Sequence, residues 1–428
     1  MKRRNFLKQG SAIVLPALLN GFTIKAFSRD SFLNSMLRYA DPASERVLVV
    51  IQLFGGNDGL NTIIPLHCYN NYFNARKNLA IPENKILPVQ GINSLGWHPA
   101  LSGFRDLYND GKLAALQSVG YPSPNFSHFR SSDIWMSAAD AMQTLNTGWA
   151  GRYLNHLYPE YPEVYPNDAM PDPVAVQVGN ATSFMFQGER SPMAINVADP
   201  DNIFNLTNGF TDVAPRTNGG KQLDFVRVVA EKTQVYSQVI KQVAGKVKQQ
   251  AIYPANNELA NQLKIVARLI GGGLKTKLYL VSFDGFDTHA QQANANDTTT
   301  GRHADLLKTI GDAISAFQSD LEYLRIHERV MGVTFSEFGR RIASNDSLGT
   351  DHGAAAPMFV FGAGVKGGMY GKAPVIAEKI THEDNLAMDI DFRSVYASLL
   401  KDWMQVPASG VGQVLPGHST TVHFIKPI

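Results

Sequence analysis

The sequence predicts an α/β fold built on a mainly parallel sheet, and two observations lead to this prediction. Short, continuous apolar runs rich in β-branched residues alternate along the chain with longer segments of helical periodicity. Such runs are typical of strands buried on both faces, and their alternation with helices favours a parallel sheet. The 428 residues, 44% of them hydrophobic and 18% charged, are enough to bury a large core.

Six apolar runs are the predicted strands. The first ends in a sharp glycine-rich turn, Gly55-Gly56-Asn57-Asp58-Gly59. A loop rich in proline and tyrosine, residues 158–173, precedes the third. In chain order, the predicted strands are residues 47–54, 113–119, 174–178, 277–283, 330–335 and 358–361.

Helical patterns separate or follow these strands. The predicted helices are residues 222–250, 257–270, 303–327 and 391–403. Asp391 stands where a carboxylate favours the first turn of the last helix. Residues 201–220, rich in Asn, Thr and Gly, predict a surface insertion, so we expect residues 28–428 to form a single α/β domain.

The N-terminal segment indicates export of an already folded protein. Arg3 and Arg4, followed by Phe6, Leu7 and Lys8, form the first part of a twin-arginine signal. The apolar stretch at residues 10–24 is too short and too interrupted for a good membrane-spanning helix. We therefore expect residues 1–27 to be a signal segment read by the twin-arginine translocation machinery, and a periplasmic or secreted location.

The charge balance excludes some classes of partner. The chain has 39 basic and 37 acidic residues, a formal net charge of +2. This gives no electrostatic reason to expect nucleic acid or a strongly anionic surface. The single cysteine, Cys68, cannot form an intrachain disulfide, and we interpret it as a small buried apolar residue rather than a catalytic thiol.

Polar residues gather beside the ends of the predicted strands. In open α/β sheets, ligands bind just outside the carboxyl ends of the strands. Aspartate, glutamate and histidine follow the first, fourth and fifth strands and precede the sixth. These residues are Asp58, Asp284, Asp287, His289, Glu337, Asp351 and His352.

The charges of this group predict a metal site. Like charges on one rim would repel each other, and the pKa values of the carboxylates and imidazoles would shift, unless a cation neutralised the carboxylates. Mixed Asp and His ligands suit zinc, manganese or iron better than an ion that prefers oxygen alone. The alternative is a set of hydrogen-bonded structural pairs, but the joint placement favours a metal or catalytic centre. We expect divalent metal ions as cofactors, with zinc, manganese and calcium as candidates.

Four motifs resemble those of the family catalogued as domain of unknown function 1501. They are Phe54-Gly55-Gly56-Asn57-Asp58-Gly59, Phe286-Asp287-Thr288-His289, Ser336-Glu337-Phe338-Gly339-Arg340 and Thr350-Asp351-His352-Gly353. The resemblance covers nearly the whole chain after the signal, and a twin-arginine signal is typical of the family. The family is grouped with the alkaline phosphatase superfamily, which includes phosphatases, sulfatases and metal-dependent phosphomutases. The grouping implies a doubly wound sheet with helices on both faces and a two-metal site.

The resemblance also implies individual metal ligands. Asp58 matches the aspartate after the first strand that holds one metal. Asp287 and His289 lie where an aspartate and a histidine hold the other metal. Their spacing is tighter than the phosphatase pattern, so Asp284 is an alternative ligand.

Near the end of the chain, Asp351 and His352 match an adjacent Asp-His pair of the superfamily. The superfamily often adds a late histidine as a further ligand. His418 is a counterpart here, with His382 and His423 as alternatives.

The nucleophile in that superfamily stands at a helix N-terminus after the second strand. Ser127 precedes a predicted helix that runs through Trp135, so it is either this nucleophile or a plain helix N-cap. His128 is then a ligand or a base, and Arg130 an anion-binding residue. The sequence after Cys68 does not match the Cys-x-Pro-x-Arg pattern, which excludes the sulfatase type of nucleophile.

We interpret Glu337 as a metal ligand or as a residue that orients a metal ligand. Two arginines follow it in the sequence. Arg340 or Arg341 would bind substrate oxyanions bidentately. The alternative is a salt bridge with Glu337 or a solvated surface position.

These observations predict an exported metal-dependent hydrolase of phosphate or sulfate esters, acting on a small anionic ester or a carbohydrate-linked substrate. The metals would polarise the ester oxygen and lower the pKa of the Ser127 hydroxyl or of bound water. The main alternative is a non-catalytic exported protein that binds or assembles with an unidentified protein partner. Phosphomutase or transferase chemistry at the same site is a third account.

Overall fold

The computed structural model describes residues 45–180, 182–201, 215 and 217–427, together with two short strands near the N-terminus. These are β1 (Leu18–Leu19) and β2 (Phe22–Thr23), which pair antiparallel. The rest of the predicted signal segment lies outside the described residues, and so does most of the predicted surface insertion. None of the helices within the described part is long and apolar enough to cross a membrane.

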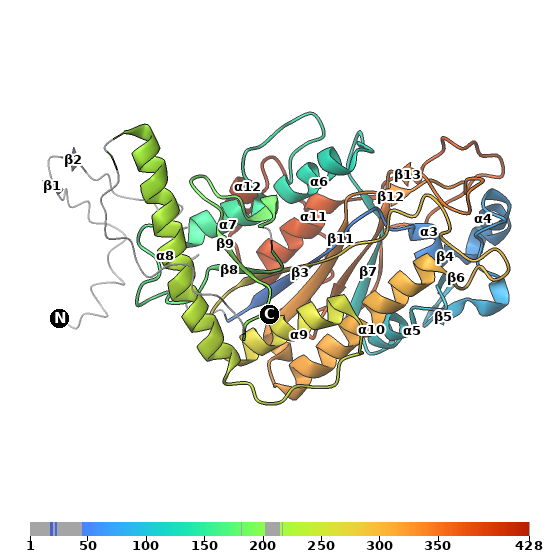
Figure 1. Ribbon diagram of the computed structural model, residues 1–428. Coiled ribbons are helices and arrows are strands. Elements are labelled where there is room, and N and C mark those ends of the chain that lie inside the picture. The colour runs from blue at the N-terminus through green and yellow to red at the C-terminus, as the bar shows by residue number, and fades with distance from the viewer. Residues whose placement is uncertain are drawn as a thin grey trace, which may run out of the picture.

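A nine-stranded sheet runs through the centre of the molecule (Figure 1). Eight of its strands lie in the order β15-β7-β14-β11-β3-β10-β8-β9, and β16 pairs with β7. The bounds are β3 (Val47–Leu53), β7 (Leu113–Gly120), β8 (Ala175–Val178), β9 (Ala194–Val197), β10 (Leu278–Phe283), β11 (Val330–Ser336), β14 (Ala356–Phe361), β15 (Gly368–Tyr370) and β16 (Ile390–Asp391).

The sheet is mainly parallel, as the sequence predicts. Strand β3 pairs parallel with both β10 and β11, and β8 pairs parallel with β10 and β9. Strand β14 is antiparallel to both of its neighbours, β11 and β7. The start of β14 therefore lies at the same edge of the sheet as the carboxyl end of β11, and this places the segment before β14 near the ends of the parallel strands.

Helices cover both faces of the sheet, which confirms the doubly wound arrangement (Figure 1). Leu48 and Val50 of β3 pack with one group of helices, and the alternating Val49 and Ile51 pack with the other. The first group is α6 (His128–Ser137), α7 (Trp149–Leu157), α11 (Phe392–Ser398) and α12 (Ala408–Val414). The second group is α5 (Ser102–Asn109), α8 (Asn218–Ala244), α9 (Glu258–Gly271) and α10 (Arg302–Tyr323).

A smaller unit packs beside one end of the sheet. Its three strands lie in the order β4-β6-β5, and it has its own cluster of buried residues, including Leu60, Tyr72 and Ile342. Its elements are α3 (Gly59–Thr62), β4 (Ile63–Pro65), α4 (Tyr69–Ala75), β5 (Leu87–Val89) and β6 (Ile92–Trp97). A further pair of short strands is β12 (Gly339–Arg340) with β13 (His352–Gly353).

The predicted strands and helices are present, with bounds that differ by a few residues. Asp391 accepts a hydrogen bond from the backbone N–H of Arg393, so it is the N-cap of α11 rather than a residue of its first turn. A π-helical turn, Leu399–Trp403, continues that helix. The largest difference is at α8, which ends at Ala244 rather than at residue 250.

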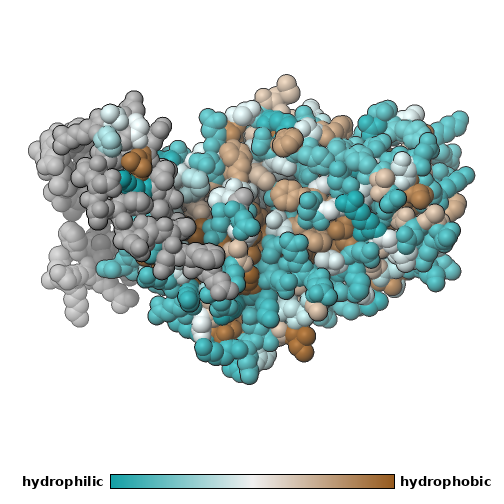
Figure 2. Space-filling view, in the orientation of Figure 1, coloured by the Kyte–Doolittle hydropathy of each residue, from teal (hydrophilic) through white to brown (hydrophobic). Residues whose placement is uncertain are grey.

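The face of the molecule in Figure 2 is mainly hydrophilic, with apolar residues scattered between polar ones. Cys68 is half-buried beside the small cluster of the β4-β6-β5 unit. Burial raises the pKa of its thiol. This fits the interpretation of Cys68 as a packing residue rather than a reactive thiol.

Candidate metal centre

The ends of three strands meet at one edge of the sheet. Leu53, the last residue of β3, is level with Phe283 of β10 and with Ser336 of β11. The segments that follow these strands, and the segment that precedes β14, therefore meet at this edge. It is the position at which open α/β sheets bind ligands.

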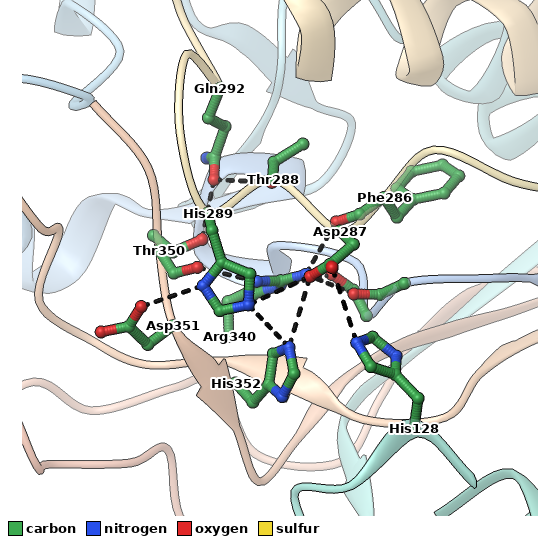
Figure 3. Close-up of polar contacts among 12 residues, drawn as sticks. His128, Phe286, Asp287, Thr288, His289, Gln292, Arg340, Thr350, Asp351 and His352 are labelled. Carbon is green, nitrogen blue, oxygen red and sulfur yellow. Dashed lines mark hydrogen bonds and ion pairs between the residues drawn. The ribbon is translucent and has the colours of Figure 1, made fainter. Parts of the chain in front are cut away.

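Three histidines converge on Asp287 at this edge (Figure 3). The Nε2 atom of His128 lies 3.6 Å from Asp287 Oδ2. The Nε2 atoms of His289 and His352 lie 3.2 Å and 3.3 Å from Asp287 Oδ1. His128 begins α6, Asp287 and His289 lie in the loop between β10 and α10, and His352 begins β13. Residues that are distant in the sequence thus form one cluster.

Two of the imidazoles are oriented by carboxylates. The Nδ1 atom of His128 lies 2.9 Å from Glu337 Oε1, and the Nδ1 atom of His289 lies 3.0 Å from Asp351 Oδ1. A carboxylate accepts hydrogen bonds, so Nδ1 carries the proton in both rings. The Nε2 atom of each ring then faces Asp287. Metal-binding histidines are typically held in this way by a carboxylate or a carbonyl.

The third imidazole is oriented by the backbone. His352 donates through Nδ1 to the carbonyl oxygen of Phe126 at 2.7 Å, and Asp287 Oδ1 lies 3.3 Å from its Nε2. That atom is 2.8 Å from Nε2 of His289. Two nitrogen lone pairs at this distance repel each other unless a proton or a cation lies between them. The pair is therefore arranged to share a positive charge.

The charge states of the cluster also favour a cation. Partial burial by itself raises the pKa of Asp287, but the hydrogen bond and charge of Arg340, together with His352 and His289, outweigh it, and the pKa is lowered overall. Partial burial lowers the pKa of His352, and the charge of Arg340 acts in the same direction. At neutral pH, Asp287 is then an anion and His352 is neutral. These are the protonation states that metal binding requires.

The donor set fits a transition metal. Ligand atoms of His128, Asp287 and His352 all lie within 4.8 Å of one another, and His289 adds a third imidazole. The buried Glu337 carboxylate accepts from Gly55 N–H through Oε1, and its Oε2 has no hydrogen-bond partner among the described residues. Three imidazoles with one carboxylate suit zinc or a similar ion better than calcium or magnesium.

A cavity of about 690 Å³ opens beside the cluster. His128, Asp287 and Glu337 lie in its wall. The wall also includes Arg302, which supplies a cationic side chain, and Phe129, whose ring is 88% exposed. The cluster is thus accessible to a small molecule.

The structure corrects the role predicted for Asp58. Its side chain is 1% exposed and forms an ion pair with Arg76. Gln292 Nε2 donates to the same carboxylate at 2.6 Å. Hydrogen bonds from these two side chains take up the oxygens that a metal would need.

Arg340 is also placed differently from the prediction. Its side chain is fully buried, and it donates to Asp287 Oδ1 at 2.7 Å and to the carbonyl oxygens of Gly56 and Thr350. A guanidinium used in this way orients Asp287 and cannot reach a substrate. The neighbouring Arg341 pairs with Glu383. Neither arginine is the predicted oxyanion-binding residue.

Ser127, Asp284 and His418 lie outside the cluster. Ser127 is exposed at the N-cap of α6, and its side chain makes no capping hydrogen bond. Asp284 is exposed in the cavity wall and accepts a hydrogen bond from Gly285 N–H. The Nε2 atom of His418 lies 3.3 Å from Asp140 Oδ1. Asp140 follows the C-terminal end of α6, whereas His128 begins this helix, which is about 15 Å long.

Other predicted residues are part of the centre or its support. Glu337 and Asp351 orient histidines, and Asp351 is further held by Asn345. Arg130, predicted as an anion-binding residue, donates to the carbonyl oxygens that follow α6, such as Ala141 O at 2.9 Å. The sequence reasoning missed Arg76 and Gln292, because neither stands in a motif or beside the end of a predicted strand.

The fold and the site define an α/β protein with a candidate divalent-metal centre at the carboxyl edge of its sheet. The profile of the family described as "Protein of unknown function (DUF1501)" matches residues 118–415. This match spans more than half of the chain, and the chain therefore belongs to that family. No curated protein matches the sequence.

Several solved structures are similar to this chain. One is the C-terminal periplasmic domain of EcEptC from Escherichia coli in complex with Zn, with a TM-score of 0.33 and 12% identity over 75% of this chain and 74% of that one. Another is a protein of the alkaline phosphatase superfamily from Vibrio parahaemolyticus, with a TM-score of 0.34 and 8% identity over 79% and 70%. The PsFucS1 sulfatase from Pseudoalteromonas sp. has a TM-score of 0.34 and 10% identity over 81% and 69%.

Proposed function

We propose that this protein is an exported, metal-dependent hydrolase of phosphate or sulfate esters. The observation that supports this most is the convergence of three imidazoles on Asp287, each with its Nδ1 held by an acceptor. Metal-binding histidines are typically held by such acceptors.

The residues that would hold the metal are His128, Asp287, His289 and His352. A divalent metal there would supply Lewis-acid polarisation of the ester oxygen and activation of a water molecule. Of the two nucleophiles that the sequence suggests, we favour water, because Ser127 is not among the residues that line the cavity. The cavity wall would hold the rest of the ester, and the guanidinium of Arg302 would attract its anionic group.

The first experiment is to measure the metal content of the purified protein beside that of two variants. We expect about one equivalent of a transition metal in the native protein and a loss of most of it in His128→Ala. His418→Ala is the matched control, because His418 lies outside the cluster and its substitution should leave the metal in place. Native protein that is folded and metal-free, even after incubation with zinc or manganese, would overturn the proposal.

The second part of the test is turnover of phosphate and sulfate esters of p-nitrophenol by the metal-loaded protein. We expect the native protein to turn over at least one of these esters. The Ser127→Ala variant should retain this turnover, and the Asp287→Asn variant should lose it. Loss of turnover in Ser127→Ala, with the metal retained, would make Ser127 the nucleophile. Metal-loaded protein that turns over neither ester nor natural sugar esters would favour the non-catalytic binding role instead.

A further inference from the structure

Beneath the candidate metal centre lies a second charged group, the ion pair of Arg76 and Asp58. Arg76 Nη1 lies 2.9 Å and 2.8 Å from the two oxygens of Asp58. The Arg76 side chain is fully buried and the Asp58 side chain is 1% exposed. Removing two charges from water in this way is costly, so it requires close compensation by neighbouring groups.

Every nitrogen of the Arg76 guanidinium donates a hydrogen bond. Nε and Nη2 donate to Ile342 O at 3.0 Å and 2.8 Å, and Nη2 also donates to Arg341 O at 2.7 Å. Nη1 donates to Asn61 as well as to Asp58. Arg76 follows α4, whereas Arg341 and Ile342 follow β12, so one side chain connects the small unit to the segment that precedes His352.

Gln292 extends this connection to the loops that carry the proposed metal ligands (Figure 3). Its Nε2 donates to Asp58, and its Oε1 accepts from the hydroxyls of Thr288 and Thr350 at 3.0 Å and 2.7 Å. Thr288 stands between Asp287 and His289, and Thr350 stands two residues before His352. The buried pair therefore supports both loops that carry the proposed ligands.

We propose that Arg76, and not a second metal ion, neutralises Asp58 and holds these two loops, so that the centre has room for one ion. The part that concerns the bound ion rests on the proposed function. Two hydrogen bonds from Arg76 and one from Gln292 satisfy the buried Asp58 carboxylate without a metal ion. Burial by itself raises the pKa of Asp58, but the charge and hydrogen bond of Arg76, the charge of His303 and the hydrogen bond of Gln292 together outweigh it and lower the pKa overall. A guanidinium supplies a permanent charge at this position and fixed donor geometry.

The first test is metal stoichiometry in the native protein and in Asp58→Asn, each saturated with zinc or manganese and freed of excess ion. We expect about one equivalent in both, because Asp58 is not a ligand. Two equivalents in the native protein and one in Asp58→Asn would overturn the proposal. Zero equivalents in both would contradict the proposed function, and the role of Arg76 would then be decided by the second test.

The second test is thermal unfolding in EDTA, which removes any contribution of bound metal. We expect Arg76→Met to lower Tm by about 5–10 °C, because it leaves the buried Asp58 carboxylate without a cationic partner. The double variant Arg76→Met with Asp58→Asn should lower Tm by less than the sum of the decreases in the two single variants. Arg105→Met, which breaks the exposed pair with Asp106, is the control and should shift Tm little. If the decreases in Tm of the two single variants add up in the double variant, the proposed pairing of Arg76 with Asp58 is overturned.

The third measurement separates positioning from a merely structural role. Arg76→Met should bind the single ion about tenfold more weakly, as is typical when the residues around a ligand are disturbed. Arg76→Lys keeps the charge and should recover part of this loss, whereas Arg105→Met should bind as the native protein does. Unchanged metal affinity in Arg76→Met would overturn the role of Arg76 in holding the loops.

Discussion

The three histidines of the site differ in the group that holds Nδ1. His128 uses the buried carboxylate of Glu337, His289 uses the half-exposed carboxylate of Asp351, and His352 uses a backbone carbonyl. A carboxylate partner increases the basicity of the imidazole, whereas a carbonyl mainly fixes its orientation. Glu337, predicted as a ligand or as an orienting residue, and Asp351, predicted as a ligand, both contact the site through the histidines that they hold.

We expect Asp351→Asn to weaken metal binding by roughly tenfold without unfolding the protein. Asparagine can still accept the hydrogen bond of His289 but lacks the negative charge, and the Asp351 side chain is 51% exposed, so the fold should tolerate the change. The dissociation constant can be measured by competition with a chelator of known affinity. Asp312→Asn, a change at a carboxylate paired with Lys308 on the surface of α10, is the control. Equal affinities in the native protein and Asp351→Asn would show that His289 does not need the charge.

At the scale of elements, the site depends on a close approach between two loops. Gly55, in the turn after β3, has φ of +114°. A Cβ atom there would lie 2.1 Å from the backbone nitrogen of Asp287. The neighbouring β10 loop can therefore lie against this turn only because position 55 lacks a side chain.

We expect Gly55→Ala to lower the free energy of unfolding by about 3 kcal/mol or more, since it combines backbone strain with a clash against backbone atoms. It should also displace Asp287 and weaken metal binding. Gly412→Ala is the control, because a Cβ there meets nothing within 4 Å and the residue lies in helix α12. Urea unfolding and metal titration of both variants test this. A Gly55→Ala protein as stable as the native one would mean that the two loops do not pack this closely in solution.

At the scale of the whole molecule, buried polar groups link the small unit to the central sheet. His303 at the start of α10 and His98 after β6 lie close together, with ring centroids 6.1 Å apart. Burial lowers the pKa of His303 to about 4 and that of His98 to about 3. Both rings are neutral in the folded protein and become protonated on unfolding below their ordinary pKa.

This predicts that stability falls as the pH is lowered from about 6.5 towards 4. The unfolded chain binds more protons than the folded one in this range, so the free energy of unfolding rises with pH there. The contribution is on the order of a few kcal/mol. Urea unfolding at a series of pH values, in EDTA so that metal release does not contribute, measures it. In the double variant His98→Gln with His303→Gln, the free energy of unfolding should depend less steeply on pH. An identical slope in the native protein and the double variant would contradict the role assigned to the two histidines.

The strands and the edge where the site lies were predictable from the sequence alone. Continuous apolar runs are a local property, and buried strands such as β3 and β11 carry that signal regardless of their neighbours. For the same reason, the placement of Asp287, His289 and His352 at one edge followed from the positions of strand ends. The predicted signal segment remains a prediction from sequence.

The tertiary structure decided which of these residues share a cluster and what each one does. Asp58 pairs with Arg76, Arg340 is buried against backbone carbonyls, and Ser127 faces solvent. His128 joins the cluster because the start of α6 packs beside Glu337. The partner of a charged side chain depends on which distant segments are buried together, and residue type and spacing carry no direct signal of this. A sequence therefore indicates where a site lies, whereas long-range packing determines which side chains can hold a metal.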